Sequence, residues 1–241
     1  MKPFLTAVVF LLALTPVMAQ LENNPSTAKK DWTKTDLSKR SSDHLMIQFG
    51  YAGWAPKPDS IQTKGFSRTF NMYFLFDFPF KTNPRLSVGI GAGVGTDNIF
   101  FEKTTIDLKN RNEVYFRRDT VTKYKKYKLA TGFLEVPLEL RYSTMPENMN
   151  KGFKFALGMK VGLPLDAHTK AKVDLDANKN GGYIAKEKDK KYINNTRVTA
   201  TMRVGYGNVT LFGSYTLTDL FKEGQGPRVK PFSVGLTLSG L

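Results

Sequence analysis

Hydrophobic residues recur at every second position over much of the chain beyond residue 44. The clearest stretch is 66–80, where large apolar side chains alternate mostly with Ser, Thr, Asn, Tyr and Asp, and only Arg68 interrupts the apolar series. An α-helix would spread these side chains around its circumference, whereas a β-strand places alternate side chains on opposite faces. The pattern therefore predicts a strand with one apolar wall.

Seven further segments show the same alternation, so eight strands are predicted in all. The eight segments are 45–51, 66–80, 86–94, 133–142, 153–165, 197–206, 209–217 and 232–238. Short breaks follow the second, fourth and sixth, and longer polar connections follow the others, at 55–65, 97–128, 168–191 and 222–228. This arrangement is typical of bacterial outer-membrane barrels. We therefore predict an all-β fold, an eight-stranded antiparallel up-and-down transmembrane β-barrel in the cell outer membrane.

The direction of the apolar walls decides between a barrel in lipid and a soluble β-protein. Eight strands enclose a space only just wide enough for their own side chains, so the aromatic wall of 66–80 and seven similar walls would not fit inside. Turned outward, the same residues match a lipid band about 25 Å tall. A soluble sheet with a solvated charged face is the alternative.

The opposite walls of these strands carry ionisable side chains that the barrel would enclose. Four are acidic and five are basic: Asp77, Glu135, Glu139 and Asp166 against Arg141, Lys154, Lys160, Arg197 and Arg203. Near balance is expected because a buried ion without a partner costs several kcal/mol of desolvation, in order of magnitude. We predict a filled lumen closed by salt bridges, with a narrow channel as the alternative.

The N-terminal residues predict export. An apolar run over 4–14 follows Lys2 and leads to small residues at the −3 and −1 positions, Val17 and Ala19, which is the pattern of a signal peptide cleaved after that alanine. Residues 20–43 are polar and show no apolar period, so we expect a flexible periplasmic leader. The predicted divisions are a signal peptide at 1–19, the leader at 20–43 and the barrel at 44–241.

Composition changes this picture in two respects. The chain has no Cys, which excludes disulfides, thiol catalysis and a lipoprotein anchor. Its formal net charge is +15, and the connection 97–128 alone holds nine Lys and Arg against five acids. A basic outer rim of this kind could bind outer-membrane lipid through lipopolysaccharide phosphates, or acidic glycans, with ordinary solubility charge as the alternative. Nucleic acid is not an expected partner of an exported chain.

One connection contains a motif for a metal. Asp176, Asn178, Asn180 and Glu187 meet the spacing of a calcium-binding loop, in which carboxylate and amide oxygens converge on Ca²⁺. Neighbouring lysines and the lack of flanking helical patterns favour a plain hairpin tip instead. Calcium at this loop is the one cofactor expectation.

A histidine at the outer rim raises the possibility of catalysis. Asp166 and His168 share one face of a predicted strand near its outer end. A general base also needs a nucleophile within reach, and no sequence feature supplies one convincingly. We therefore expect no enzyme, and keep a rim enzyme acting on lipid A or peptides as the alternative.

Aromatic residues lie near the predicted strand ends, where a girdle would anchor the barrel at the two interfaces. The candidates are Tyr51, Trp54, Phe100, Phe101, Tyr142 and Tyr206.

Several segments of the second half carry a resemblance. They are 133–142 (FLEVPLELRY), 155–158 (FALG), 205–206, Tyr215, 219–220 and 232–236 (FSVGL). Together they resemble the PorT-like outer-membrane β-barrel family of Bacteroidota. The resemblance implies an eight-stranded barrel of structural or interaction role, and its name-giving branch implies a place in a protein-export assembly. Residues 238–241 depart from many barrels, since they lack a terminal aromatic residue.

Overall fold

A computed structural model describes residues 44–120, 122, 124–148, 150–174 and 182–240. The predicted signal peptide and leader, 1–43, lie outside the described residues and stay predictions. Among the residues described, no helix is both long enough and apolar enough to cross a membrane.

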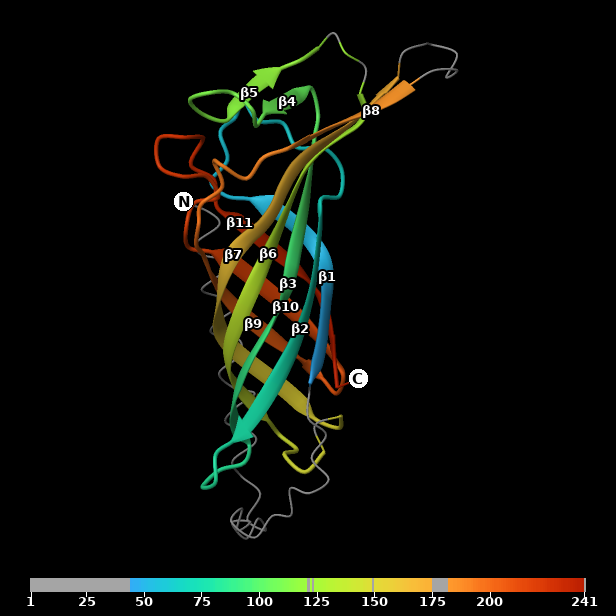
Figure 1. Ribbon diagram of the computed structural model, residues 1–241. Coiled ribbons are helices and arrows are strands. Elements are labelled where there is room, and N and C mark those ends of the chain that lie inside the picture. The colour runs from blue at the N-terminus through green and yellow to red at the C-terminus, as the bar shows by residue number, and fades with distance from the viewer. Residues whose placement is uncertain (1–43, 121, 123, 149, 175–181, 241) are drawn as a thin grey trace, which may run out of the picture. The chain divides into compact units, whose positions relative to one another are not determined.

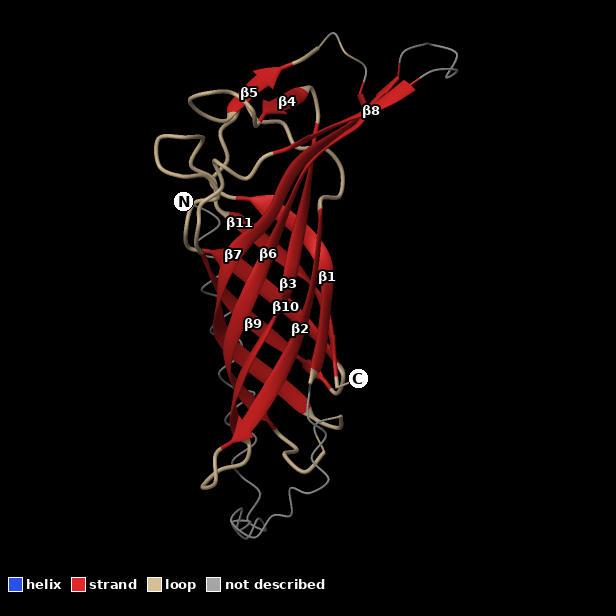
Figure 2. Ribbon diagram, viewed as in Figure 1, coloured by secondary structure: helices blue, strands red, loops and turns tan. Residues whose placement is uncertain are grey.

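Eight strands form a closed antiparallel barrel (Figures 1 and 2). They are β1 (Leu45–Trp54), β2 (Arg68–Pro79), β3 (Leu86–Phe101), β6 (Tyr124–Ser143), β7 (Phe153–Asp174), β9 (Arg197–Tyr206), β10 (Val209–Thr216) and β11 (Pro231–Ser239). Each strand pairs with the next in chain order, and β11 pairs with β1 to close the ring. The predicted all-β, eight-stranded, up-and-down barrel is confirmed.

The apolar walls face outward, as predicted. Phe74, in the middle of the aromatic stretch, is 51% exposed, whereas its neighbours Tyr73 and Leu75 point into the barrel and are buried. The same contrast runs along β6 and β7, where Leu138 and Met159 are exposed beside buried Glu139 and Lys160. An exposed apolar band of this extent is unfavourable in water and is matched by lipid.

Glycines in β3 make room for the charges of the neighbouring strand. A Cβ atom at Gly89 would lie 2.6 Å from the guanidinium carbon of Arg141, and one at Gly95 would lie 2.7 Å from Oε2 of Glu135. Any larger residue at these positions would displace a lumen ion. The glycine wall of β3 is therefore part of the lumen packing.

The predicted long connections contain more strand than expected. β3 continues to Phe101, β6 begins at Tyr124 and β7 runs to Asp174; β8 (Gly182–Lys188) then pairs with the end of β7, and β4 (Thr104–Asp107) pairs with β5 (Tyr115–Arg118). The strand ends predicted on either side of 97–128 and 168–191 are therefore too short. These strand ends carry lysines on their outer wall and apolar residues on their inner wall, so a search for outward apolar walls missed them.

Candidate functional site: the filled lumen and its loop cap

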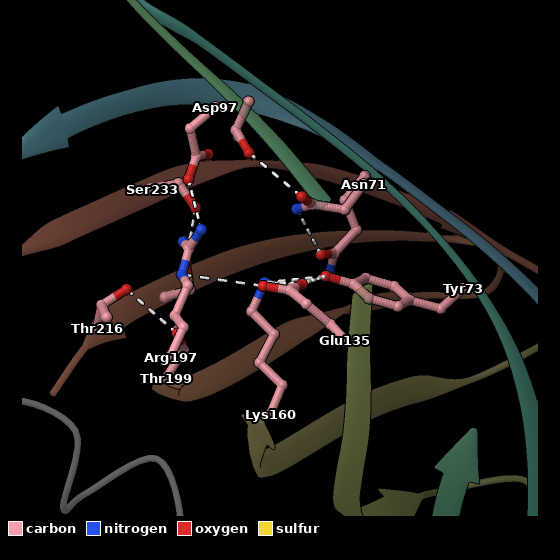
Figure 3. Close-up of polar contacts among 12 residues, drawn as sticks. Asn71, Tyr73, Asp97, Glu135, Lys160, Arg197, Thr199, Thr216 and Ser233 are labelled. Carbon is pink, nitrogen blue, oxygen red and sulfur yellow. Dashed lines mark hydrogen bonds and ion pairs between the residues drawn. The ribbon is translucent and has the colours of Figure 1, made fainter. Parts of the chain in front are cut away.

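A first group of ions crosses the lumen between five strands. The Glu135 cluster consists of Tyr73, Asp97, Glu135, Lys160 and Arg197 (Figure 3). The Lys160 ammonium lies 2.9 Å from Glu135 Oε2 and 2.9 Å from the Tyr73 hydroxyl, which itself donates to Glu135. Arg197 donates to Asp97 at 2.8 Å and lies 3.9 Å from the other oxygen of Glu135. Each carboxylate thus has cationic partners within the barrel.

A second group, the Glu139 cluster, consists of Asp77, Glu139, Arg141 and Arg203. Two nitrogens of Arg203 donate to the two oxygens of Glu139, at 2.6 and 3.2 Å. Arg141 donates to Glu139 at 3.0 Å and lies 3.4 Å from Asp77. All four side chains are buried. A forked guanidinium on a carboxylate is the strongest pairing that side chains offer, so this cluster ties β2, β6 and β9 together across the lumen.

On β9, β10 and β11, uncharged side chains also form hydrogen bonds with one another on the inner wall. Thr199 and Thr216 are 3.1 Å apart, and Ser214 and Ser233 are 2.6 Å apart. Two cavities beside the ion clusters, one next to Arg141 and Arg203 and the other next to Phe133 and Arg197, measure about 10 Å³ each. A single water needs about 10–15 Å³, so neither cavity is a conduit.

The structure places eight of the nine predicted lumen ions in the interior. Lys154 is buried there on β7, and seven others belong to the two clusters. Asp166 is the exception, and its assignment to the lumen is wrong. Gly132 pairs with Asp166 but Phe133 pairs with Pro164, so Leu165 is an extra residue in β7. This bulge reverses the inward and outward positions, and Asp166 faces outward at 33% exposure.

Asp97 is the lumen acid that the sequence reading missed. It lies at the start of the predicted connection 97–128, although it continues the two-residue series of Gly93 and Gly95 on the inner wall of β3. That series was the available signal. With Asp97 in place of Asp166, the enclosed ions still number four acids and five bases.

Above the bulge, the inner wall becomes apolar. Side chains from the strand ends and the outer connections form a buried cluster, which we call the loop cap: Ala52, Trp54, Ile61, Ile99, Phe101, Ile106, Leu108, Val114, Tyr127, Leu129, Phe133, Ala167, Ala171, Val173, Tyr192, Ile193, Leu220, Phe221 and Val229. The Trp54 ring lies 5.4 Å from Phe101 and 6.3 Å from Phe221. The loop cap is a dry core of the kind found in soluble proteins, and it covers the outer end of the lumen.

The loop cap corrects part of the predicted girdle. Trp54 and Phe101 are buried within it, so their assignment to the membrane interface is wrong. Tyr142 and Tyr206, by contrast, are exposed at the short-turn ends of β6 and β9. Both buried rings continue the inward series of their own strands, Trp54 two residues after Ala52 on β1 and Phe101 two residues after Ile99 on β3.

Tyr127 joins the loop cap to the β4–β5 hairpin. Its hydroxyl accepts from the Ile106 amide at 2.8 Å and donates to the Ile106 carbonyl at 2.9 Å. Burial raises the pKa of Tyr127 to about 12. The hydroxyl is therefore neutral at physiological pH and able to make both contacts.

We expect Tyr127→Phe to loosen this hairpin. The substitution leaves a buried amide and carbonyl without a partner, which costs about 1–3 kcal/mol. Hydrogen exchange of the Ile106 amide should become faster by the corresponding factor. Tyr115→Phe, on an exposed ring of the same hairpin, is the matched control and should leave the exchange rate unchanged. Equal rates in both variants would contradict the role given to Tyr127.

The calcium motif lies largely outside the described residues. Asp176, Asn178 and Asn180 fall in 175–181, whereas Glu187 is half-buried on β8 opposite Thr169. Within the described part of the chain, no group of three or more His and acidic side chains could hold a metal. Calcium binding stays a prediction.

The rim pair of Asp166 and His168 does form. Asp166 Oδ2 lies 2.6 Å from Nδ1 of His168, and its other oxygen lies 2.8 Å from the Lys188 ammonium. Among the described residues, the ring has no hydrogen-bonded nucleophile. The pair is therefore an ionic contact on the outer wall, without the third member that acyl transfer needs.

A family model described as "Outer membrane protein beta-barrel domain" matches residues 18–239 of the chain. The matched range contains every strand of the barrel and every residue of the two ion clusters. A comparison with curated proteins gives no match.

Proposed function

Since the chain belongs to the outer membrane protein β-barrel domain family, we propose that it serves in the outer membrane as a non-conducting scaffold. Its role in this proposal is structural or interactive, and it is carried by the surfaces outside the lipid band. One observation supports the proposal above all others: buried ion pairs and a dry loop cap together fill the path that a solute would take.

The ion pairs of the lumen need an explanation other than stability. Replacing a buried ion pair by apolar residues often leaves the free energy of unfolding unchanged or increases it. In a small barrel the ion pairs fix the register of the strands around the ring, because each cluster joins side chains from several strands at once.

We expect the purified barrel to give no steady conductance in a planar bilayer. The reason is steric, since the cavities beside the ions hold at most about one water each. Heat-modifiable migration of the same sample in detergent gels should establish that the protein is folded. Reproducible unitary openings of the folded protein would favour the narrow channel instead.

The resemblance to the PorT-like family supports a finer proposal, a place in a protein-export assembly. A partner of this kind would contact the outer connections or the periplasmic side and would avoid the lipid-facing wall. We expect a photo-crosslinking residue at exposed Tyr115 of β5 to capture a protein in intact cells. The same residue at lipid-facing Leu138 is the matched control and should capture lipid. Capture of lipid alone at Tyr115 and along the leader would contradict the export role.

The Asp166–His168 pair is the single observation that favours the rival function, a rim enzyme acting on lipid A or peptides. The distance of 2.6 Å suits a general base held by a carboxylate. The second oxygen of Asp166 is occupied by Lys188, which makes an ionic network of these three residues. We therefore rank catalysis below the scaffold.

A further inference from the structure

The outer wall of β7 changes its chemistry at the bulge. Below Leu165, the outward residues are apolar and lipid-facing, as in Leu163. Above it, the outward residues are Asp166, His168, Lys170 and Lys172. In Figure 1 this upper part of β7 runs between β6 and β8 and extends above the barrel wall. The lipid-facing band is therefore followed directly by a charged face.

The register brings lysines of three strands together on this face. Lys128 of β6 pairs with Lys170 of β7, which pairs with Lys186 of β8. In the next row, Lys126 pairs with Lys172. Side chains directly opposite on neighbouring strands have Cβ atoms about 4.5–5.5 Å apart. We call these five residues the lysine rows.

The lysine rows lack acidic partners in the described part of the chain. Lys128 donates to Asn98 at 2.5 Å, and Lys126 lies 4.8 Å from the centre of the Phe100 ring. The described acid on this face is Asp166, which His168 and Lys188 already hold. Glu187 is in register with inward-facing Thr169 and so belongs to the opposite face.

Like charges repel one another within the rows. Partial burial and the charges of Lys170 and Lys126 lower the pKa of Lys128. Like charges directly opposite on a sheet are destabilising, and a surface that serves solubility alone mixes both signs. The fold thus holds several positive charges close together, and a bound anion would reduce their mutual repulsion.

The position of the lysine rows, directly beyond the lipid-facing wall, indicates which kind of anion they meet. On β7, Leu163 and Leu165 are exposed on the lipid-facing wall, and His168 and Lys170 follow three and five residues beyond Leu165 toward the outer end. Lys128 and Lys170 lie one row further out, beyond Ala130 and His168. Cations at this level meet the headgroups of the surrounding leaflet and not its acyl chains.

We propose that the lysine rows bind the phosphate groups of an anionic glycolipid in the outer leaflet next to β6, β7 and β8. The acyl chains of this lipid lie against the apolar wall below the bulge, and its phosphates lie against Lys128, Lys170 and Lys186. This binding would supply a ligand for the proposed interaction role. It depends on that proposal only in requiring that the barrel lie in the outer membrane. It is independent of whether the lumen conducts, so a failed conductance prediction leaves it standing.

The test compares two triple variants of the full barrel in uncharged detergent. K128Q/K170Q/K186Q removes one row, whereas K81Q/K109Q/K151Q removes three exposed lysines elsewhere. The probe is bisphosphorylated lipid A, with binding followed by native mass spectrometry. Because each lysine near an anionic surface strengthens binding severalfold, we expect the first variant to bind at least about tenfold more weakly. The control variant should bind as the unmodified protein does.

Three results would overturn the proposal. They are equal binding by the row variant, equal binding of lipid A stripped of its phosphates, and binding of inorganic pyrophosphate as tight as that of lipid A. The last would indicate a soluble anion in place of a membrane lipid. Heat-modifiable migration reports folding of each variant. If the triple variant does not fold, K170Q and K186Q, each on an exposed side chain, replace it, and each should weaken binding about threefold or more.

Discussion

Glu139→Gln should cost the folded barrel about 3–5 kcal/mol, the largest effect that we expect from a single substitution. Glu139 receives three hydrogen bonds from Arg203 and Arg141 at 2.6–3.2 Å. Removing its charge leaves two guanidinium groups buried with one remaining acid, Asp77, near Arg141. Urea unfolding of the barrel in lipid vesicles, followed by heat-modifiable migration, measures the loss.

An exposed ion pair supplies the matched control for this prediction. Lys64 and Glu102 lie 3.3 Å apart with side chains 64% and 45% exposed, so Glu102→Gln should change the stability by less than about 1 kcal/mol. Adding Arg203→Met to Glu139→Gln should recover part of the loss, because one uncompensated cation is then removed. The role of the Glu139 cluster would be refuted by a Glu139→Gln loss no greater than that of Glu102→Gln.

Leu138→Arg should destabilise the barrel by about 2–4 kcal/mol, since it places a cation in the middle of the exposed apolar series of β6, which runs from Leu134 to Tyr142. Leu138 is exposed, with Ile90 and Met159 beside it on the neighbouring strands. The same unfolding measurement applies. The cost of a charge on the lipid face depends on its depth in the bilayer. A second position on the same strand, closer to the interface, therefore serves as the control.

Tyr142→Arg lies on the same wall of β6, four residues toward the short turn. Close to the interface, a cation costs only about 0–1 kcal/mol. A large difference between the two arginine variants is expected in lipid vesicles. Similar losses at both positions would mean that this wall is not arranged across a hydrocarbon layer.

Most of the membrane-spanning part could be predicted from one sequence because its signal is local. In β2, Phe70, Phe74 and Phe78 face one side and Tyr73 faces the other, and strand geometry permits no other arrangement. The lumen ions of β6 follow equally directly, since Glu135, Glu139 and Arg141 alternate with leucine and valine. The narrow interior of eight strands then fixed which wall faces lipid.

The outer third could not be predicted in the same way. Lys126, Lys128, Lys170 and Lys172 have the spacing of a strand, but their charge made these segments look like solvated loops. The apolar partners on the other wall, Tyr127 and Val173 among them, come from segments far apart in the sequence and meet only in the loop cap. The cap residues on strand ends keep the two-residue spacing, as Tyr127 and Leu129 do, whereas those from the connections, such as Ile61 and Val229, follow no period of their own.

By itself, the sequence determined the barrel, its outward apolar walls and eight of its nine enclosed ions, because side-chain alternation within a strand is a local property of the backbone. The tertiary structure alone decided the position of Asp166, the dry loop cap and the facing lysines. Each of these depends on register between strands, and one extra residue, Leu165, exchanges the two walls of β7 from that point on.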